Sequence, residues 1–310
     1  MKRILYLLTA FLLTASVANA QFTANSKWYD GDERITCASE SSKSFMFEAE
    51  WWGEDGTTFT LTKTTDNHFT VSNYDDYDYL ERIKDVEYRV VEGHKLLLFK
   101  DAKGNILKHF ELADEEDMWE PEILKGYHYI INGTYVDAKG TKYTINDDEF
   151  IAGGKSLHYN IDPEQYNIME MEDNNHYWWV VSTTGINIYK TTEGEYGYEM
   201  GALWLKLKNV SPNGRWAFLS NAIVPSNTMW RFSSDLIRIM RNEIYARRGY
   251  VFNSADLKAY FSKQPWYKPL NNNNAVKLNA IESLNIELLK ANETAAREGT
   301  DDEEIEKGLE

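Results

Sequence analysis

Between residues 45 and 210 the chain alternates apolar and polar positions in short runs that turn residues separate. A period of two places successive side chains on opposite faces, so each run predicts a β-strand with one buried face. The clearest runs are TTFTLTKT, HFTVSNY, EYRVV, KLLLFK, ILKHFEL, HYWWVVSTTGINIYK and GALWLKLKNV. We therefore expect an antiparallel, β-rich region over most of the chain.

Two hairpins can be located from their turns. The tetrapeptide Asp-Ala-Lys-Gly occurs at 101–104, inside KLLLFKDAKGNILKHFEL, and again at 137–140, inside GTYVDAKGTKYTI. In both places glycine stands where a hairpin turn needs a positive φ, which glycine adopts without strain. Each tetrapeptide therefore predicts a tight connection between two antiparallel strands.

The β pattern divides into two parts, residues 45–118 and 126–210, with 112–126 as a linker that contains Pro121. The stretches 50–61 and 133–145 share an aromatic residue, an acidic turn with glycine, and a Thr-x-aromatic-Thr-aliphatic run. This similarity suggests a duplication, although independent hairpins converge on the same pattern. The two parts form either two small barrels or sandwiches, or one continuous barrel or sandwich.

From Ser233 the apolar period changes to that of a helix. Ile237, Met240 and Ile244 form one stripe, and Ser233 or Ser234 can cap the amino end. Asp235 would then lie in the first turn, where a negative charge favours the helix dipole. A helix is expected to end at Gly249, the residue type that most often closes a helix in the left-handed conformation.

Two further helices are expected in the same region. SADLKAYF begins a second helix at Ser254, and KQPWYKP ends it. Asn279 and Glu282 have the spacing of a capping box at the start of a third helix. We therefore predict an α+β protein in which a small three-helix domain at 230–292 follows the β region. The remaining parts are an N-terminal segment at 21–44 and an acidic, disordered tail at 293–310.

The first twenty residues have the pattern of a signal peptide. Lys2 and Arg3 precede the apolar run ILYLLTAFLLTASV, and Ala-Asn-Ala at 18–20 resembles a cleavage site. We expect cleavage after Ala20 and export of the chain to the periplasm or the medium. The single cysteine, Cys37, stands far beyond that position, which argues against a lipoprotein. No later stretch is apolar enough to span a membrane.

Charge is distributed unevenly along the chain. Residues 21–230 carry 19 Lys and Arg against 36 Asp and Glu, whereas residues 231–290 carry 10 against 5. An acidic body of this kind argues against nucleic acid as the partner. One cysteine excludes an intramolecular disulfide, so the domains must depend on ordinary cores.

The helical region resembles the YARHG domain family. The family is named for a Tyr-Ala-Arg-His-Gly motif, which corresponds here to Tyr245-Ala246-Arg247-Arg248-Gly249. The resemblance covers about 60 of 310 residues and departs from the family where Arg248 replaces histidine. It also includes residues with an expected structural role: Asn242, Glu243, Gly249, Phe252, Glu282 and Asn285. The family implies an extracellular or envelope module without an established reaction.

Two interpretations of the motif compete. In the structural one, Arg247 and Arg248 offset the carbonyl charge of the last helical turn, Glu243 pairs with Arg247, and Arg241 to Glu243 hold later loops or the third helix. In the functional one, a basic and aromatic pocket binds carboxylates, phosphates or sugars. Its residues would be Arg241, Tyr245, Arg247, Arg248, Trp266 and Tyr267.

The sequence gives little support for a catalytic site or a metal site. The six histidines lack metal-binding spacing, and the acidic stretch YDDYDYLE at 74–81 lacks the glycine of a calcium loop. No nucleophile motif is present, and Cys37 has no neighbouring histidine in the sequence. We therefore expect no catalytic residues, metal or cofactor.

The leading function is a non-catalytic binding or interaction protein of the bacterial envelope, with the helical domain as its contact surface. Its partner would be cell-wall glycan, peptidoglycan or an envelope protein. A first alternative is a carbohydrate-binding protein that uses β-region aromatics, either the pair at 51–52 or the pair at 178–179. Adjacent residues of a strand face opposite sides, so one of each pair should be core. A second alternative is an envelope hydrolase with an unrecognised carboxylate pair. The oligomeric state stays open.

Overall fold

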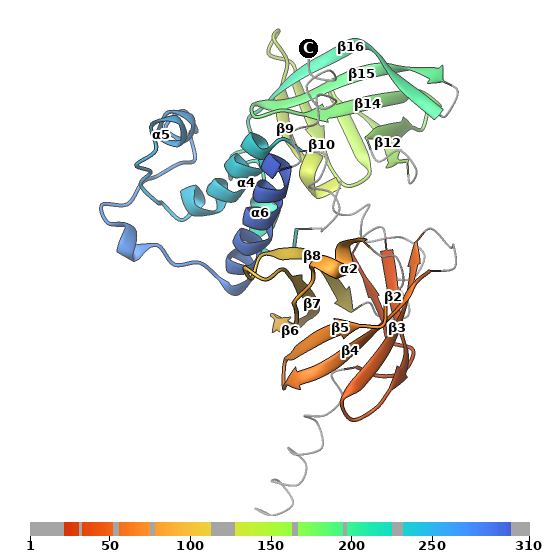
Figure 1. Ribbon diagram of the computed structural model, residues 1–310. Helices are drawn as coiled ribbons and strands as arrows, with labels where there is room; N and C mark the ends of the chain where they lie inside the picture. Colours follow the sequence, from red (N-terminus) through yellow and green to blue (C-terminus); the bar gives the residue numbers. More distant parts are fainter. Residues whose placement is uncertain are drawn as a thin grey trace, which may run out of the picture. The chain divides into compact units, whose positions relative to one another are not determined.

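The computed structural model describes residues 22–30, 33–51, 56–74, 78–112, 128–162, 167–194, 197–224 and 232–298. The signal peptide, the 113–127 part of the linker and residues 299–310 of the tail lie outside these ranges. The chain divides into two compact units, Met1–Glu116 and Asp117–Glu310 (Figure 1). Each unit is described by itself.

The first unit is an eight-stranded antiparallel barrel. Its strands follow one another in sequence order, and the first pairs with the last, so Trp28 lies opposite Leu112. A short helix, α2 (Asp78–Arg82), stands between two of them. The strands are β1 (Lys27–Tyr29), β2 (Glu33–Glu40), β3 (Ser44–Trp51), β4 (Thr58–Thr65), β5 (His68–Ser72), β6 (Asp85–Val91), β7 (His94–Lys100) and β8 (Ile106–Leu112).

The second unit begins with another eight-stranded antiparallel barrel. One helical turn at 128–131 precedes it, and its first and last strands also pair. The strands are β9 (Gly133–Val136), β10 (Lys142–Ile145), β11 (Glu149–Ala152), β12 (Lys155–Ile161), β13 (Ile168–Met171), β14 (His176–Val181), β15 (Gly185–Gly194) and β16 (Gly197–Asn209). The predicted antiparallel β-rich fold is confirmed, in the form of two closed barrels.

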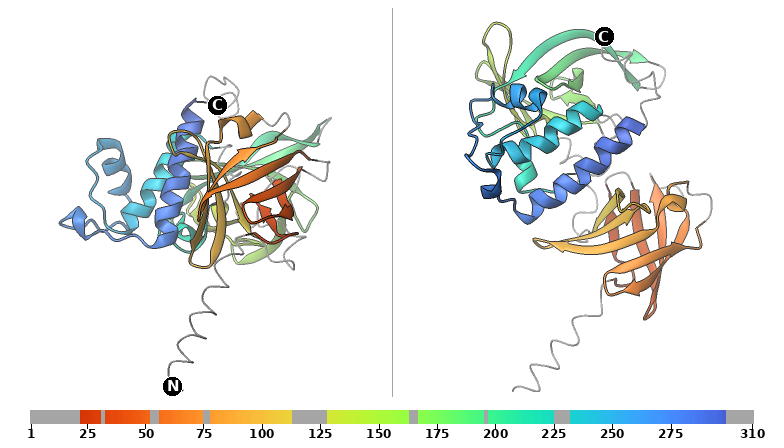
Figure 2. Two further views of the ribbon diagram at one scale, coloured as in Figure 1. Left: turned by 60° about the horizontal axis from the view of Figure 1, so that its bottom comes forward. Right: turned by 60° about the vertical axis from the view of Figure 1, so that its left-hand side comes forward.

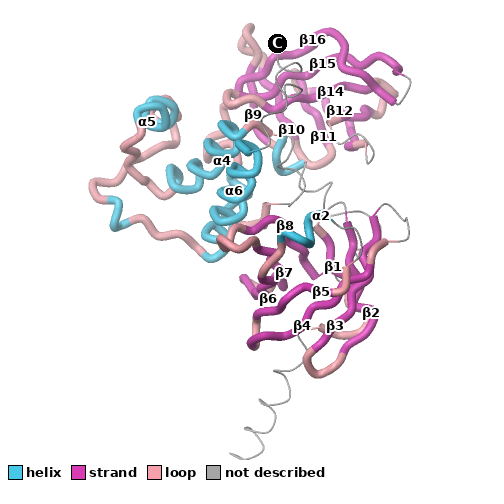
Figure 3. Tube along the Cα trace, viewed as in Figure 1, coloured by secondary structure: helices cyan, strands magenta, loops and turns pink. Residues whose placement is uncertain are grey.

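Helices complete the second unit. A 3-10 helix, η2 (Ala217–Ser220), precedes the helices α4 (Ser234–Arg247), α5 (Ala255–Phe261) and α6 (Ala280–Glu298), and a second 3-10 helix, η4 (Asn273–Ala275), lies just before α6. Helices α4 and α6 pack side by side (Figure 2), and α4, α5 and α6 follow the last strand, β16, along the chain (Figure 3). Among the described residues, no helix combines the length and the apolar character needed to cross a membrane.

Both predicted hairpins are confirmed, and their turns are built alike. Asp101 lies between β7 and β8, and Asp137 lies between β9 and β10. In each turn the aspartate Oδ1 accepts two backbone N–H groups at 2.8 Å, two and four residues further on. The glycines at 104 and 140 have φ values of +81° and +82°, as their position requires.

The similarity noted between 50–61 and 133–145 does not follow the strand order. The first stretch spans β3 and β4, which are the third and fourth strands of the first barrel. The second stretch spans β9 and β10, which are the first two strands of the second barrel. The shared topology of the two barrels fits a duplication, but this pair of hairpins occupies different places in it.

Three boundaries differ from the predicted ones. The first barrel begins before residue 45, because β1 and β2 pair with each other and close the sheet. Residues 78–81 of the acidic stretch at 74–81 lie in α2. Helix α6 continues to Glu298, past the predicted start of the tail at 293, because Glu293 is only 5% exposed and binds Arg241 on α4.

The interior of the first barrel is filled by aromatic side chains. Phe22, which precedes β1, is 2% exposed. Its ring lies 4.7–6.1 Å from five other rings, in edge-to-face contacts. These rings belong to Trp28, Phe45, Phe47, Phe69 and Tyr88. Edge-to-face pairs of this kind contribute beyond the area they bury. The segment before the first strand is therefore part of the barrel core.

Replacing Phe22 by alanine should destabilise the first barrel by about 3–5 kcal/mol, the usual cost of a cavity of this size in a rigid core. Urea unfolding followed by tryptophan fluorescence would measure the change. The control is Val90→Ala, because Val90 is 55% exposed and its truncation should cost less than about 0.5 kcal/mol. Equal stability of the two variants would contradict the role of Phe22.

Candidate functional site

Helix α4 carries the motif and has the predicted ends. The Ser233 Oγ accepts the N–H of Leu236 at 3.3 Å, so Ser233 is the cap. At the other end Gly249 has a φ of +82°. Its N–H donates to Ala246 O at 2.9 Å, and the next N–H, of Tyr250, donates to the carbonyl at 245 at 3.0 Å. These two bonds define a Schellman motif.

Glycine at 249 is also required by its surroundings. A Cβ on Gly249 would lie 2.9 Å from the Lys268 carbonyl oxygen and 2.7 Å from Leu270 Cγ. Both distances are shorter than a carbon atom tolerates. The motif glycine therefore ends α4 and allows the chain after α5 to pass close to it.

The predicted capping box of α6 is confirmed. The Glu282 N–H donates to Asn279 Oδ1 at 2.7 Å, and the Asn279 N–H donates to Glu282 Oε2 at 3.0 Å. This reciprocal pair satisfies two amide groups that a helix start otherwise leaves free. Glu282 is fully buried, so its carboxylate does more than cap the helix.

The two motif arginines and Arg241 bind groups of their own domain. Arg248 Nε lies 2.9 and 3.0 Å from the two Glu282 carboxylate oxygens. Arg241 donates twice to Glu293 Oε2, at 2.7 and 2.9 Å. Arg247 donates to the carbonyl at 217 and to the hydroxyl at 220, at 3.1 and 2.9 Å. This geometry supports the structural interpretation of the motif.

Buried polar side chains of α4 and α6 hold the irregular segment 215–224. Glu243 Oε1 accepts the N–H of Trp216 at 2.7 Å, where the sequence suggested a pair with Arg247. Asn285 accepts the N–H of Val224 and donates to the carbonyls at 219 and 222, all at 2.8 Å. The segment 215–224 therefore belongs to the helical domain, although its sequence has no helical period.

The predicted binding residues lie in three separate environments. Arg241 and Arg248 face α6, and Arg247 faces the 3-10 turn η2. The aromatic members Tyr245, Trp266 and Tyr267 pack on a different cluster, whose buried members are Ala246, Phe252, Leu257 and Phe261. The structure therefore does not bring the six residues into one pocket, although the Arg248 side chain keeps 41% exposure.

The pKa values of the two buried carboxylates, Glu243 and Glu282, are shifted in opposite directions. Burial raises the pKa of Glu243 to about 7, against the smaller opposing effects of the Trp216 N–H and of two nearby arginine charges. Burial also acts on Glu282, but hydrogen bonds from Arg248 and Ser220 outweigh it and lower its pKa. Glu243 is therefore the buried carboxylate that titrates near neutral pH.

Arg215 joins the helical domain to the second barrel. It is 6% exposed, and it donates to the carbonyls of Ser182 and Gly185, the latter at 2.6 Å. Its guanidinium also lies 4.7 Å from the Trp216 ring centroid. Tyr260 on α5 donates to the carbonyl at 183 at 2.9 Å. The turn between β14 and β15 is therefore held from two sides by the helical domain.

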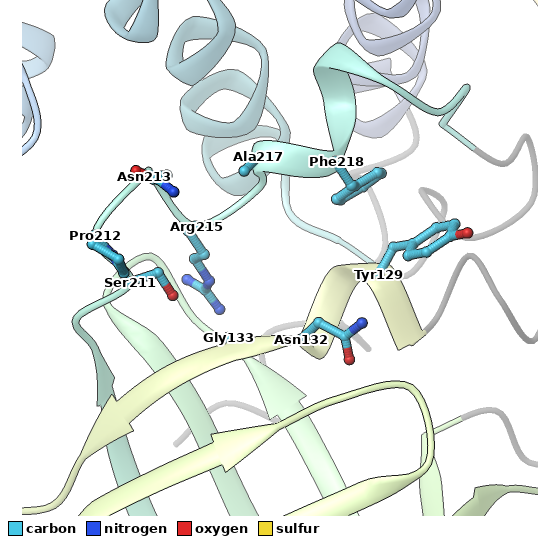
Figure 4. A pocket seen from close by; sticks show the side chains of 10 residues that line it. Tyr129, Asn132, Gly133, Ser211, Pro212, Asn213, Arg215, Ala217 and Phe218 are labelled. Carbon is cyan, nitrogen blue, oxygen red and sulfur yellow. The ribbon is translucent and has the colours of Figure 1, made fainter.

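A pocket of about 230 Å³ lies at this junction (Figure 4). The rings of Tyr129 and Phe218 stack at one end, with centroids 5.5 Å apart. Arg215 extends from the loop before η2 toward the start of β9. The lining residues are Tyr129, Asn132, Gly133, Ser211, Pro212, Asn213, Gly214, Arg215, Ala217 and Phe218.

The outer face of the second barrel carries a second group of candidates. Trp178, Tyr189 and Leu203 lie opposite one another on β14, β15 and β16. The first two are half-buried and Leu203 is 52% exposed. Their neighbour Trp179 is 4% exposed, so the expectation that one tryptophan of the 178–179 pair is core is confirmed. Trp51 and Trp52 lie outside the described side chains.

A polar row runs beside these residues. Glu170 lies opposite His176, and its carboxylate is 3.3 Å from the imidazole Nε2. The Tyr198 ring stacks on that imidazole at 4.2 Å, with its hydroxyl 3.0 Å from Nε2. Met200 on β16 is 38% exposed. The outer face of β13–β16 therefore combines aromatic, aliphatic and hydrogen-bonding groups.

Sequence alternation could not identify Leu203. Leu203, Leu205 and Leu207 are spaced two residues apart, and regular alternation would place all three side chains on the inward face. However, the pairing of β15 with β16 shifts register between Ile188 and Tyr189. A bulge of this kind reverses the alternation beyond it. Leu203 therefore turns outward, while Leu207 stays in the core at 2% exposure.

Other residues considered for chemistry have structural surroundings. Cys37 is fully buried in β2, and burial raises its pKa to about 11, which suppresses the reactive thiolate. His109 is 5% exposed, and burial lowers its pKa to about 4. Within the described parts of the chain, no three His, Cys, Asp or Glu side chains are grouped so that they could hold a metal ion.

Residues 216–294 match the family model of the YARHG domain. The predicted resemblance is thus confirmed, and the match begins at Trp216, the residue whose N–H binds Glu243. No curated protein and no solved structure matches the chain.

If Glu282 holds Arg248 and Ser220 as the geometry indicates, Glu282→Gln should lower the free energy of unfolding by about 1.5–3 kcal/mol, the range for a charge-assisted hydrogen bond. Thermal and urea unfolding would measure it. Lys290→Gln on the exposed side of α6 changes one charge as well and should have an effect below about 0.5 kcal/mol. A neutral Glu282 variant would refute the structural role of the pair.

Glu243 should make stability depend on pH. Its pKa rises from 4.5 to about 7 on folding, so the folded state holds the proton more tightly than the unfolded state. The contribution is complete below about pH 4.5 and is lost as the pH rises through 7. Glu243→Gln keeps the acceptor for Trp216 but cannot ionise. The stability of the wild type relative to this variant should fall by roughly 3 kcal/mol from pH 4.5 to 8; a constant difference would contradict the shift.

Proposed function

We propose that the protein is an exported, non-catalytic binding protein, and that it binds glycans on the outer face of β13–β16. The YARHG domain is associated with extracellular and periplasmic proteins, which supports export. Cleavage of the leading segment after Ala20, without lipid attachment, belongs to the same proposal. The observation that carries the binding site is the row formed by Trp178, Tyr189 and Leu203 across three adjacent strands.

The chemistry of this face suits a sugar. One side of a pyranose ring presents C–H groups, which pack on the flat face of an indole or a phenol. Tyr and Trp are the side chains that combine such an apolar surface with a polar group. Glu170, His176 and Tyr198 beside them offer acceptors and donors for sugar hydroxyls. Exposed apolar residues next to polar ones are typical of binding sites.

The position of the face in the fold supports a rigid site. Strands β14 and β15 form one hairpin, and Arg215 and Tyr260 of the helical domain hold its turn. A site on a β-hairpin whose turn is held in place loses little conformational entropy on binding. In this proposal the YARHG domain positions the hairpin, and the barrel contacts the ligand.

A second candidate keeps the contact surface on the helical domain itself. The 41% exposure of the Arg248 side chain favours it, because that guanidinium could engage an acidic partner while Nε remains on Glu282. Trp266 and Tyr267 are only partly buried and could contribute. Binding of this kind would depend on charge and therefore on salt, unlike stacking on aromatic rings.

Co-sedimentation with purified peptidoglycan sacculi at low and high salt would test the two candidates. We expect the chain to pellet at both salt concentrations. Trp178→Ala and Tyr189→Ala should each weaken binding by tenfold or more, as is common for aromatic residues at the centre of an interface. Arg248→Gln and the barrel control Val90→Ala should pellet as the wild type does. Circular dichroism would confirm that each variant is folded.

Two results would contradict the glycan proposal. One is salt-sensitive pelleting that Arg248→Gln abolishes while Trp178→Ala retains it, which would move the contact surface to the helical domain. The other is no pelleting of the wild type at either salt concentration, which would leave cell-wall glycan without support as the partner.

A further inference from the structure

Helix α5 and the chain that joins it to α6 differ in charge from the rest of the molecule. Residues 257–279, the lysine segment, contain four lysines and neither Asp nor Glu. The whole chain has 49 Asp and Glu in 310 residues and a net charge of −16, so this positive charge is a local feature. The lysines are Lys258, Lys263, Lys268 and Lys277.

The charges of these lysines are available to a partner. All four side chains belong to exposed residues. The carboxylates that border the segment in the sequence are already bound by arginines of α4 and of its carboxyl end. Asp256 pairs with Arg238. Glu282 pairs with Arg248.

Successive turns fold the chain after α5. The backbone N–H groups of residues 263, 264 and 267 each donate to the carbonyl three residues earlier, at 2.9–3.3 Å. The Tyr267 hydroxyl donates to the carbonyl of Tyr250 at 2.7 Å. Lys263 and Lys268 therefore stay close to Trp266, which lies between them in the sequence. A surface held in this way loses little conformational entropy when it binds.

Apolar side chains accompany the charges. Leu270 is 38% exposed. Trp266 is half-buried, and its ring meets the Phe261 ring edge to face, with centroids 6.1 Å apart. Even fully extended, the chain from Lys263 to Leu270 would span at most about 25 Å. The charged and the apolar groups therefore belong to one region of the surface.

We propose that the lysine segment docks on a membrane surface that contains anionic lipids. Its lysines lie at the phosphate layer, and Trp266 and Leu270 enter the boundary between headgroups and acyl chains. Basic residues beside Trp and Leu are typical of binding at this boundary. Lysine is a compact point charge without the planar fork by which arginine grips a single phosphate. An extended anionic surface therefore suits the segment better than one bound phosphate.

The net charge of the chain does not prevent this contact. Charges more than about 8 Å away are largely screened at physiological ionic strength. A lysine near an anionic bilayer raises the partition of a protein onto it about fivefold. Figure 1 shows α5 and the chain after it at the margin of the second unit, beyond α4, where a flat surface can reach them.

Co-sedimentation of the exported chain, residues 21–310, with lipid vesicles tests the proposal. One set of vesicles contains phosphatidylcholine alone, and the other contains phosphatidylcholine with phosphatidylglycerol. We expect binding to the anionic set only, and we expect it to weaken as salt is added. The lysine segment shares no residue with the outer face of β13–β16, and these vesicles carry no glycan. The result is therefore independent of the glycan proposal.

A pair of matched variants locates the contact. Lys263→Gln combined with Lys268→Gln should weaken binding to the anionic vesicles roughly twenty-five-fold at low salt. The control combines Lys139→Gln with Lys155→Gln, at two exposed lysines of the second barrel. Both double variants change the net charge equally, so only a contact at the lysine segment makes them differ. Circular dichroism shows that each variant is folded.

The proposal is overturned if the chain binds both sets of vesicles equally or binds neither set. It is also overturned if the two double variants bind the anionic vesicles equally. Soluble polyphosphate separates the two sources of phosphate. If it binds the chain through Lys263 and Lys268 while the vesicles do not bind, the partner is a free phosphate polymer and the membrane proposal is wrong.

Discussion

The second unit depends on partners for the buried backbone groups that the irregular segment 215–224 does not pair internally. Residues 215–224 contain one 3-10 turn and otherwise no regular structure, yet Trp216, Leu219 and Val224 are buried. A buried N–H or C=O without a partner is costly. The partners come from α4 and α6, whose buried Glu243 and Asn285 bind this segment. Polar side chains of α4 and α6 thus bring an irregular segment into the core of the second unit.

This constraint explains which features could be predicted. Helix ends, the capping box of Asn279 and Glu282, and the two Asp-Ala-Lys-Gly turns depend on contacts between residues a few positions apart, which a sequence displays directly. The partner of Arg248 is Glu282, and the partner of Arg241 is Glu293. No local rule joins residues so distant. The suggested pair of Glu243 with Arg247 was a local inference, and the carboxylate instead accepts the N–H of Trp216.

The same reasoning applies to the barrels. Alternation identified most strands, because it reports only that one face is buried. It could not distinguish two barrels from one sheet, since closure depends on pairs such as Trp28 with Leu112. Nor could it assign Phe22, which belongs to no strand and still fills the first barrel. Register shifts in β16 reverse the alternation at Leu203, so the most exposed apolar residue of the outer face could not be predicted.

The side chains of the motif and of its neighbours bind groups inside their own domain, so the ligand site should be sought elsewhere. A side chain that satisfies a buried backbone group is constrained by the fold, whatever the domain contacts. Glu243, Glu282 and Asn285 are such residues, and Arg241, Arg247 and Arg248 bind the same framework. A motif of this kind identifies a domain without identifying its ligand. Ligand contacts are then to be sought at positions that the framework leaves free, such as the outer face of β13–β16.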